Sequence, residues 1–226
     1  MKRICRYLPI LSLLLLCVPF ASAQSSVDFM LGFGTAHDAA NGGGLEGLDS
    51  VNALGSCTPG ANSDGFCQSN PALGGFFLGI GGDVMLWKRF GIGAAADVQP
   101  ARSNYGPLLY RQAFYDVNGI FRPVSTKRVV LQLEGGIGGA HTGFGINETG
   151  CVGTVVCSSA IEPVGSTNHF DIHAGVGLSL FVTEHIFIRP QFDIHYAPGL
   201  GGINNQFSSN VVPMGMVWVG YSFGDR

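Results

Sequence analysis

Apolar and polar positions alternate along most of the chain, which is the pattern of strands with two different faces. In segment 26–36 one face carries Val27, Phe29, Leu31, Phe33 and Thr35, and the other carries Asp28, Met30, Gly32 and Gly34. The alternation returns in segments 75–86, 90–99, 109–121, 129–138, 170–180, 186–196 and 211–223. Phe114 and Ile120 interrupt it, and the last segment is apolar on both faces. We therefore predict eight strands, each near the ~9–11 residues that cross a membrane when tilted.

The connections between these segments alternate in length. Long or moderate connections are expected at 37–73, 100–107, 143–167 and 198–210, and short ones at 87–89, 122–128 and 183–185. Outer-membrane barrels show this order, with tight turns toward the periplasm and larger loops outside. The predicted fold class is all-β: an eight-stranded antiparallel up-and-down transmembrane β-barrel with long extracellular loops and short periplasmic turns.

Composition supports a membrane barrel. Hydrophobic residues make up 46% of the chain, charged residues only 12%, and 35 residues are glycine. After residue 20 no apolar run approaches the ~18 residues that a spanning helix needs. A closed barrel is the other structure that satisfies its backbone hydrogen bonds inside lipid.

The first residues have the layout of a secretory signal peptide. Lys2, Arg3 and Arg6 precede an apolar run at 8–20, and Ala21-Ser22-Ala23 follows it. We predict a signal peptide at 1–23, a barrel domain at 24–226, and export to the cell outer membrane. Export removes three of the 12 basic residues and none of the 15 acidic ones, which leaves a formal charge of −6. Such a chain has no basic face to hold nucleic acid.

Four cysteines remain after the signal peptide, in two close pairs. Cys57 lies near Cys67, and Cys151 lies near Cys157. An exported chain meets an oxidising compartment, so we predict two local disulfides, each clasping one loop. A four-thiolate zinc site is disfavoured, because its ligands usually have closer spacing.

The word FDIH occurs twice, at 170–173 and at 192–195. If the phenylalanines and isoleucines face lipid, the aspartates and histidines face the lumen. A turn at 183–185 pairs His173 with His195, and a shift of two residues pairs Asp171 with His195 instead; a shift of one would exchange the faces.

We predict that these side chains belong to a hydrogen-bonded and ion-paired network in the lumen. Its expected members are Asp97, Asp116, Asn118, Gln132, Glu134, His169, Asp171, His173, Arg189, Gln191, Asp193 and His195. A divalent metal held by His173, His195 and an aspartate is the alternative. Spacing alone does not show a coordination geometry, so the sequence favours the network, with no metal or other cofactor.

The signal peptide, the eight strands, the stretch YDVNGIFRP and the ending VWVGYSFGDR together resemble the small outer-membrane β-barrels of the OmpA-type membrane domain superfamily. The ending GYSF is similar to the C-terminal aromatic signal that the barrel-assembly machinery recognises in that class, with Tyr221 and Phe223 facing lipid. Here Gly224, Asp225 and Arg226 follow the aromatic residue. The chain shows no second domain after the last strand, so the resemblance does not imply a peptidoglycan-binding role.

The function expected from the sequence is a structural or surface-interaction role in the outer membrane, through disulfide-clasped extracellular loops that bind an unknown partner. A catalytic role is not expected. In barrels that deacylate lipid A, a serine stands two positions after the histidine, whereas His195 is followed by Tyr196 and Ala197. The alternatives are a narrow porin-like channel and a soluble lipocalin-like ligand-binding barrel with its apolar face inward.

Overall fold

The computed structural model describes residues 26–38, 73–105, 108–152, 156–201 and 206–224. The predicted signal peptide at 1–23 and the cysteine pair Cys57 and Cys67 lie outside these residues. Within these ranges, no helix has the length and apolar character needed to cross a membrane.

The described residues form antiparallel strands at all eight predicted positions, which confirms the all-β assignment. The strands are β1 (Val27–His37), β2 (Gly74–Met85), β3 (Phe90–Val98), β4 (Ser103–Tyr105), β5 (Leu108–Ser125), β6 (Val129–Val152), β7 (Val156–Phe181), β8 (Ile186–Tyr196) and β9 (Val211–Phe223). Only the three-residue β4, in the connection between β3 and β5, was not predicted.

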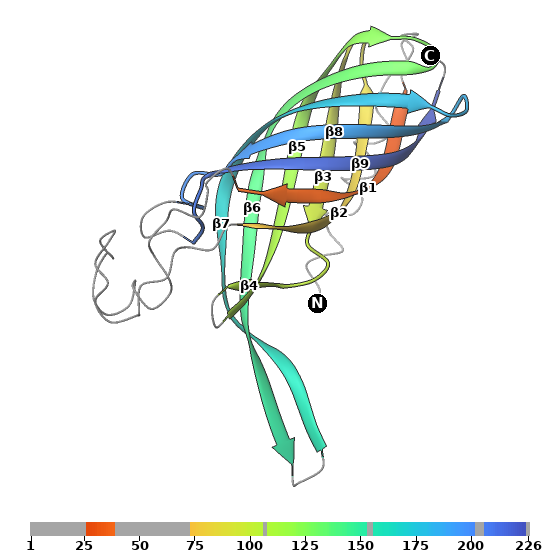
Figure 1. Cartoon of the computed structure of the whole chain (residues 1–226). Coiled ribbons are helices and arrows are strands. Elements are labelled where there is room, and N and C mark those ends of the chain that lie inside the picture. The colour runs from red at the N-terminus through yellow and green to blue at the C-terminus, as the bar shows by residue number, and fades with distance from the viewer. Residues whose placement is uncertain (1–25, 39–72, 106–107, 153–155, 202–205, 225–226) are drawn as a thin grey trace, which may run out of the picture.

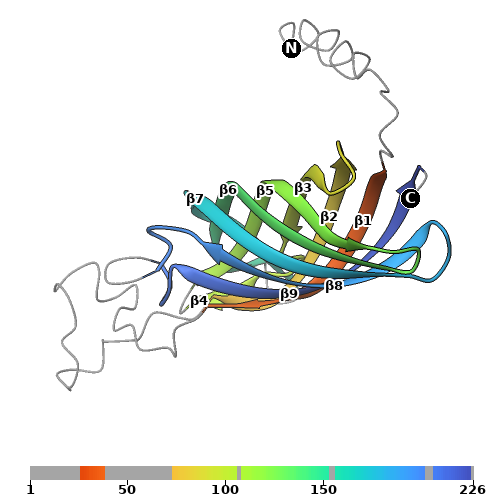
Figure 2. The same cartoon turned by 90° about the horizontal axis from the view of Figure 1, so that it is seen from above.

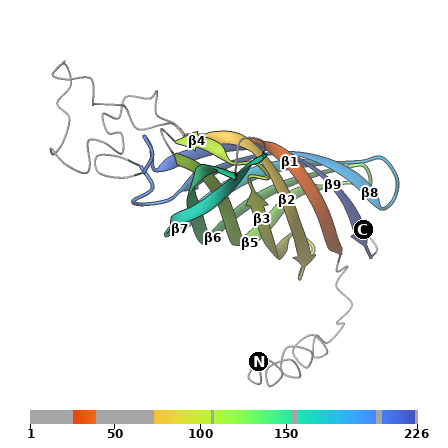
Figure 3. The same cartoon turned by 90° about the horizontal axis from the view of Figure 1, so that it is seen from below.

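The sheet closes on itself. Its order is β3-β2-β1-β9-β8-β7-β6-β5-β4, and β3 also pairs with β5. The ring therefore contains eight strands, and β4 pairs with β5 outside it. Figures 2 and 3 show β3 lying beside β5 and β1 beside β9. Closure leaves no unpaired edge in the ring, as a lipid environment requires.

The two faces of the ring differ in chemistry in the way that the alternation predicted. Along β1, Phe29 is 49% exposed and Leu31 is 56% exposed, whereas Asp28 is 2% exposed. Large apolar side chains face outward from every strand of the ring, including Ile80, Ile92, Val117, Ile137, Ile172, Ile194 and Val219. A soluble lipocalin-like barrel requires the opposite orientation, with its apolar side chains inside.

The extent of β6 and β7 corrects one prediction. The segment 143–167 was expected to be a loop, but its residues continue the two strands, from the pair Gly143↔Ser166 to Val152↔Val156. Figure 1 shows this hairpin extension projecting from the end of the barrel where β4 lies. Beyond the barrel neither face borders lipid or lumen, so the sequence there has no alternation to reveal a strand.

The short connections lie at the opposite end of the barrel and are tight turns. Backbone bonds join Trp87 N–H to Phe90 C=O at 3.0 Å, and Thr126 N–H to Val129 C=O at 2.9 Å. The predicted turn at 122–128 is shorter than expected, because β5 runs to Ser125 through an irregularity between Phe121 and Val124. Pro123, which has no N–H to donate, lies within this irregularity.

Glycines on the inner face make room for large side chains. A Cβ atom on Gly32 would lie 2.5 Å from the Trp218 indole, and one on Gly79 would lie 2.4 Å from it. The indole of Trp218 is 2% exposed. The small residues of β1 and β2 thus allow the largest side chain of β9 to pack inside a narrow ring.

Candidate functional site in the barrel lumen

Four charged side chains lie together in the lumen near the turn end. We call this group the arginine cluster: Asp28, Asp83, Arg122 and Arg189. Arg122 Nη2 lies 2.6 Å from Asp28 Oδ2, and Arg189 Nη1 lies 2.9 Å from Asp83 Oδ2. Arg189 Nε also donates to Ser179 Oγ at 2.8 Å. All four charged side chains are buried. Two cations thus balance two anions, as a buried charge group requires.

The two FDIH words meet farther along the lumen. The ladder pairs His173 of β7 with His195 of β8, which is the first of the two registers that the sequence allowed. The two imidazole rings stack with centroids 5.1 Å apart. Together with Asp116 of β5, Glu134 of β6, Asp171 of β7 and Asp193 of β8, these residues form what we call the histidine cluster.

Each histidine of this cluster is held by a carboxylate on one ring nitrogen. His195 Nδ1 lies 2.7 Å from Asp171 Oδ2, and His173 Nε2 lies 3.3 Å from Glu134 Oε1. Gln191 Nε2 donates to Glu134 Oε1 at 2.7 Å and to Asp193 Oδ1 at 3.0 Å. These contacts fix the orientation of both imidazole rings and provide hydrogen bonds to the carboxylates of Glu134 and Asp193.

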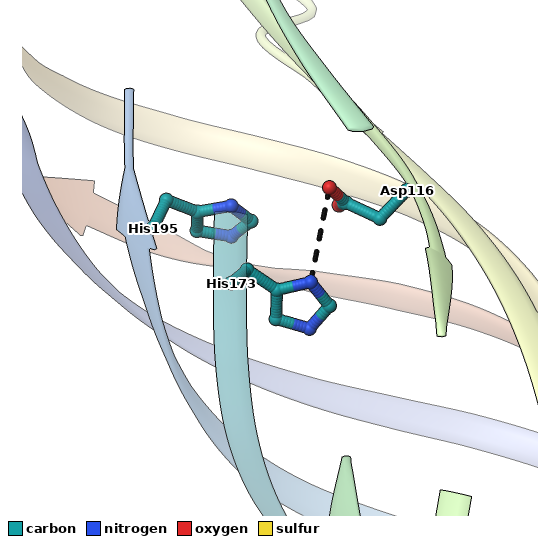
Figure 4. Close-up of side chains that lie close together, drawn as sticks. All are labelled: Asp116, His173 and His195. Atoms are coloured by element: carbon teal, nitrogen blue, oxygen red, sulfur yellow. Dashed lines mark ion pairs between the residues drawn. The ribbon is translucent and has the colours of Figure 1, made fainter. Parts of the chain in front are cut away.

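The other side of the histidine cluster is unsatisfied. His173 Nδ1 and Asp116 Oδ1 are both buried without a hydrogen-bond partner in the described residues, and they face each other at 3.7 Å. Figure 4 shows this pair beside the ring of His195. One potential ligand atom from each of Asp116, His173 and His195 lies within 4.8 Å of the others. This group has the composition of a metal-binding site.

Aromatic side chains occupy the lumen near the loop end. The rings of Phe77, Tyr105, Tyr110, Phe114 and Phe207 contact one another or neighbouring rings. Tyr110 Oη donates to Gly74 C=O at 2.9 Å, and Tyr105 Oη donates to the Gln206 carbonyl. Burial raises the pKa of Tyr105 to about 12, so its hydroxyl remains a donor at neutral pH.

The structure places the twelve residues predicted for the network on the inner face, but they differ in how many hydrogen bonds their side chains make. Eight of them take part in side-chain hydrogen bonds there: Gln132, Glu134, Asp171, His173, Arg189, Gln191, Asp193 and His195. Asp116 approaches His173 only as an ion-pair partner. Asp97, Asn118 and His169 each keep a buried polar atom without a partner among the described residues. His169 lies apart from the histidine cluster, against Gly199.

Sequence reasoning missed three of the four members of the arginine cluster. Arg122 was assigned to the short connection at 122–128, and Asp28 and Asp83 were placed on the inner face but not in the network. The alternation along β5 could have predicted that Arg122 faces the lumen, because Arg122 continues the inward series of Asp116, Asn118 and Ile120.

Closure into eight strands, the exposed apolar exterior and the buried polar interior together decide the architecture. It is that of a small eight-stranded outer-membrane β-barrel. No protein-family model matches the chain, and no curated protein sequence matches it.

Solved structures of similar shape share little sequence with this chain. The attachment invasion locus protein Ail of Yersinia pestis is 12% identical, over 89% of this chain and 99% of its own, with a TM-score of 0.44. Neisserial surface protein A is 12% identical, over 90% and 98%, with a TM-score of 0.47. The N-terminal β-barrel domain of Pseudomonas aeruginosa OprF is 13% identical, over 89% and 98%, with a TM-score of 0.43.

Proposed function

We propose that this protein is exported through its N-terminal signal peptide, resides in the outer membrane, and acts as a rigid, non-conducting support for an extracellular recognition surface. The observation that carries the proposal is the hairpin extension of β6 and β7, which projects beyond the barrel as a paired ladder with one irregularity between Phe144 and Gly145. A ladder joined to two barrel strands holds its exposed side chains in fixed positions, and recognition sites commonly lie on loops above a rigid scaffold.

The hairpin extension exposes apolar side chains that no lipid covers in this arrangement. Ile161 is 45% exposed and Val164 is 59% exposed. Surface positions of this kind, on an element that leaves the membrane, suit contact with another macromolecule. We propose that its partner is extracellular, and that Cys151 and Cys157, which stand opposite each other in the ladder, form a disulfide near the hairpin tip.

The outward face of the last strand carries a candidate signal for insertion into the membrane. Tyr221 is 41% exposed and Phe223 is 56% exposed, and both lie on the outward face of β9. We propose that this aromatic pair is the signal by which the barrel-assembly machinery inserts the chain into the outer-membrane lipid.

Accessibility in intact cells tests the location and the orientation together. Val164→Cys in the hairpin extension and Val182→Cys in the turn between β7 and β8 introduce thiols at two highly exposed positions at opposite ends of the barrel. A membrane-impermeant maleimide is expected to label Val164→Cys in intact cells, and Val182→Cys only after the outer membrane is permeabilised. Unsubstituted protein is the control for the native cysteines. Equal labelling of both variants in intact cells would contradict the proposal.

The channel alternative predicts ion conduction. The lumen, however, holds the arginine cluster, the histidine cluster and the aromatic side chains near the loop end. An eight-stranded barrel is just wide enough for side chains to fill its interior. We therefore expect no stepwise conductance in planar bilayers that contain the folded protein. A reproducible unit conductance that an arginine-cluster variant such as Arg122→Ser enlarges would establish the channel instead.

A further inference from the structure

We propose that the lumen binds one divalent transition-metal ion of the Zn²⁺ type, held by Asp116, His173 and His195. These residues come from β5, β7 and β8, so the ion would connect three strands of the ring (Figure 4). The proposal is independent of the surface role proposed above.

The first argument is the pair of unpartnered atoms. With His173 Nε2 bonded to Glu134, Nδ1 is the ring nitrogen left to bind an ion, and it faces a carboxylate oxygen of Asp116 at 3.7 Å. Neither atom has a hydrogen-bond partner among the described residues, and a buried polar atom without a partner is unfavourable. Zinc–nitrogen and zinc–oxygen bonds of ~2.0–2.2 Å at a tetrahedral angle separate two ligand atoms by ~3.4 Å. The observed separation is therefore close to that of two ligands of one ion.

The second argument is the carboxylate behind each imidazole. His195 Nδ1 donates to Asp171 Oδ2 at 2.7 Å, which leaves Nε2 as the nitrogen that can bind an ion, and Nε2 has no hydrogen bond to any described residue. His173 is oriented in the same way by Glu134. Metal-binding histidines almost always donate their second ring N–H to a carboxylate, a carbonyl or a water, which fixes the tautomer and strengthens the ligand.

The third argument is charge. Asp97, Asp116, Glu134, Asp171 and Asp193 bring five carboxyl groups into this part of the lumen, where Asp97 lies diagonally across the β3–β5 ladder from Asp116. Among the described residues, the basic groups within ion-pair distance of Asp116, Glu134, Asp171 and Asp193 are the imidazoles of His173 and His195 alone. A divalent cation supplies the positive charge that such a buried group lacks.

The donor set determines the class of ion. Two imidazole nitrogens and one carboxylate oxygen suit zinc and neighbouring first-row metals, whereas calcium and magnesium prefer all-oxygen sites. A neighbouring group, Glu134, His173 and Asp193, also has close potential ligand atoms. Its oxygens already accept hydrogen bonds from Gln191, and His173 Nε2 carries the proton donated to Glu134, so this second group is satisfied without an ion.

The test is to count zinc in the folded protein. The mature chain is refolded in detergent with Zn²⁺, dialysed against metal-free buffer, and analysed for zinc by mass spectrometry; folding is checked by the different gel migration of heated and unheated samples. We expect about one ion per chain, the stoichiometry of a single site. His195→Gln and Asp116→Asn are expected to lose the ion. His169→Gln, on the same inner face but outside the histidine cluster, is expected to keep it.

Two further readouts separate a built site from adventitious binding. Cobalt(II) in place of zinc is expected to give visible absorption bands that His195→Gln abolishes and His169→Gln preserves. Asp171→Asn is expected to weaken zinc binding by about 10–100-fold, as is usual when a carboxylate behind a histidine ligand is changed. Folded wild-type protein that retains no zinc after dialysis would overturn the proposal, and so would equal zinc retention in His195→Gln and the wild type.

Discussion

Arg189→Met is expected to lower the free energy of unfolding of the barrel by about 3–5 kcal/mol, the usual cost of breaking a buried ion pair by removing one partner. Arg189 is 1% exposed and lies 2.9 Å from Asp83, which is itself 4% exposed. Methionine preserves much of the volume but supplies no charge. Urea titration of the protein in lipid vesicles, followed by tryptophan fluorescence, measures the change.

A matched control separates burial from loss of charge. Arg128 lies exposed in the turn between β5 and β6, and Arg128→Met is expected to change stability by no more than about 0.5 kcal/mol. The double variant Arg189→Met with Asp83→Asn is expected to recover part of the loss, because it removes the uncompensated charge. If Arg189→Met costs no more than Arg128→Met, the arginine cluster does not stabilise the barrel.

Ile137→Arg is expected to cost about 2–4 kcal/mol, the range measured for arginine on the lipid face near the bilayer midplane. Ile137 is 58% exposed, and its neighbours across the two ladders, Val117 and Ile172, are also apolar and exposed. Refolding yield and urea stability in vesicles are the measurements.

The control for this substitution lies outside the apolar exterior. Val182 is 69% exposed in the turn between β7 and β8, and Val182→Arg is expected to cost about 0–1 kcal/mol, as at the membrane interface. A soluble barrel predicts that neither substitution matters. Similar small effects at both positions would therefore contradict the membrane assignment of the exterior.

The strands of the barrel were predictable because two solvents act on them at once. Where one face meets lipid and the other the lumen, the side chains must alternate, and β1, β8 and β9 lie within about a residue of their predicted bounds. The hairpin extension of β6 and β7 was not predictable in this way. Water borders both of its faces, and its pairing depends on the backbone, which leaves no trace in the order of polar and apolar residues.

The histidine cluster was predictable in membership but not in detail. Parity along each strand placed Asp171, His173 and His195 in the lumen, and it left two registers open. The register itself, and the diagonal contact of His195 with Asp171, required coordinates. Asp116 belongs to β5, three strands of the ring away from β8, and only the closure of the ring brings it to the two histidines.

The pairing of β1 with β9 has a consequence for the order of events during biogenesis. The ladder places Val27 opposite Phe223, so the two strands of this seam are separated by most of the chain. Contacts so distant along a chain form slowly, since a large loop must close before they contribute. On the export route proposed above, the ring cannot be completed until the C-terminal strand has crossed the inner membrane, and until then the periplasm must keep an unclosed, strongly apolar polypeptide from aggregating.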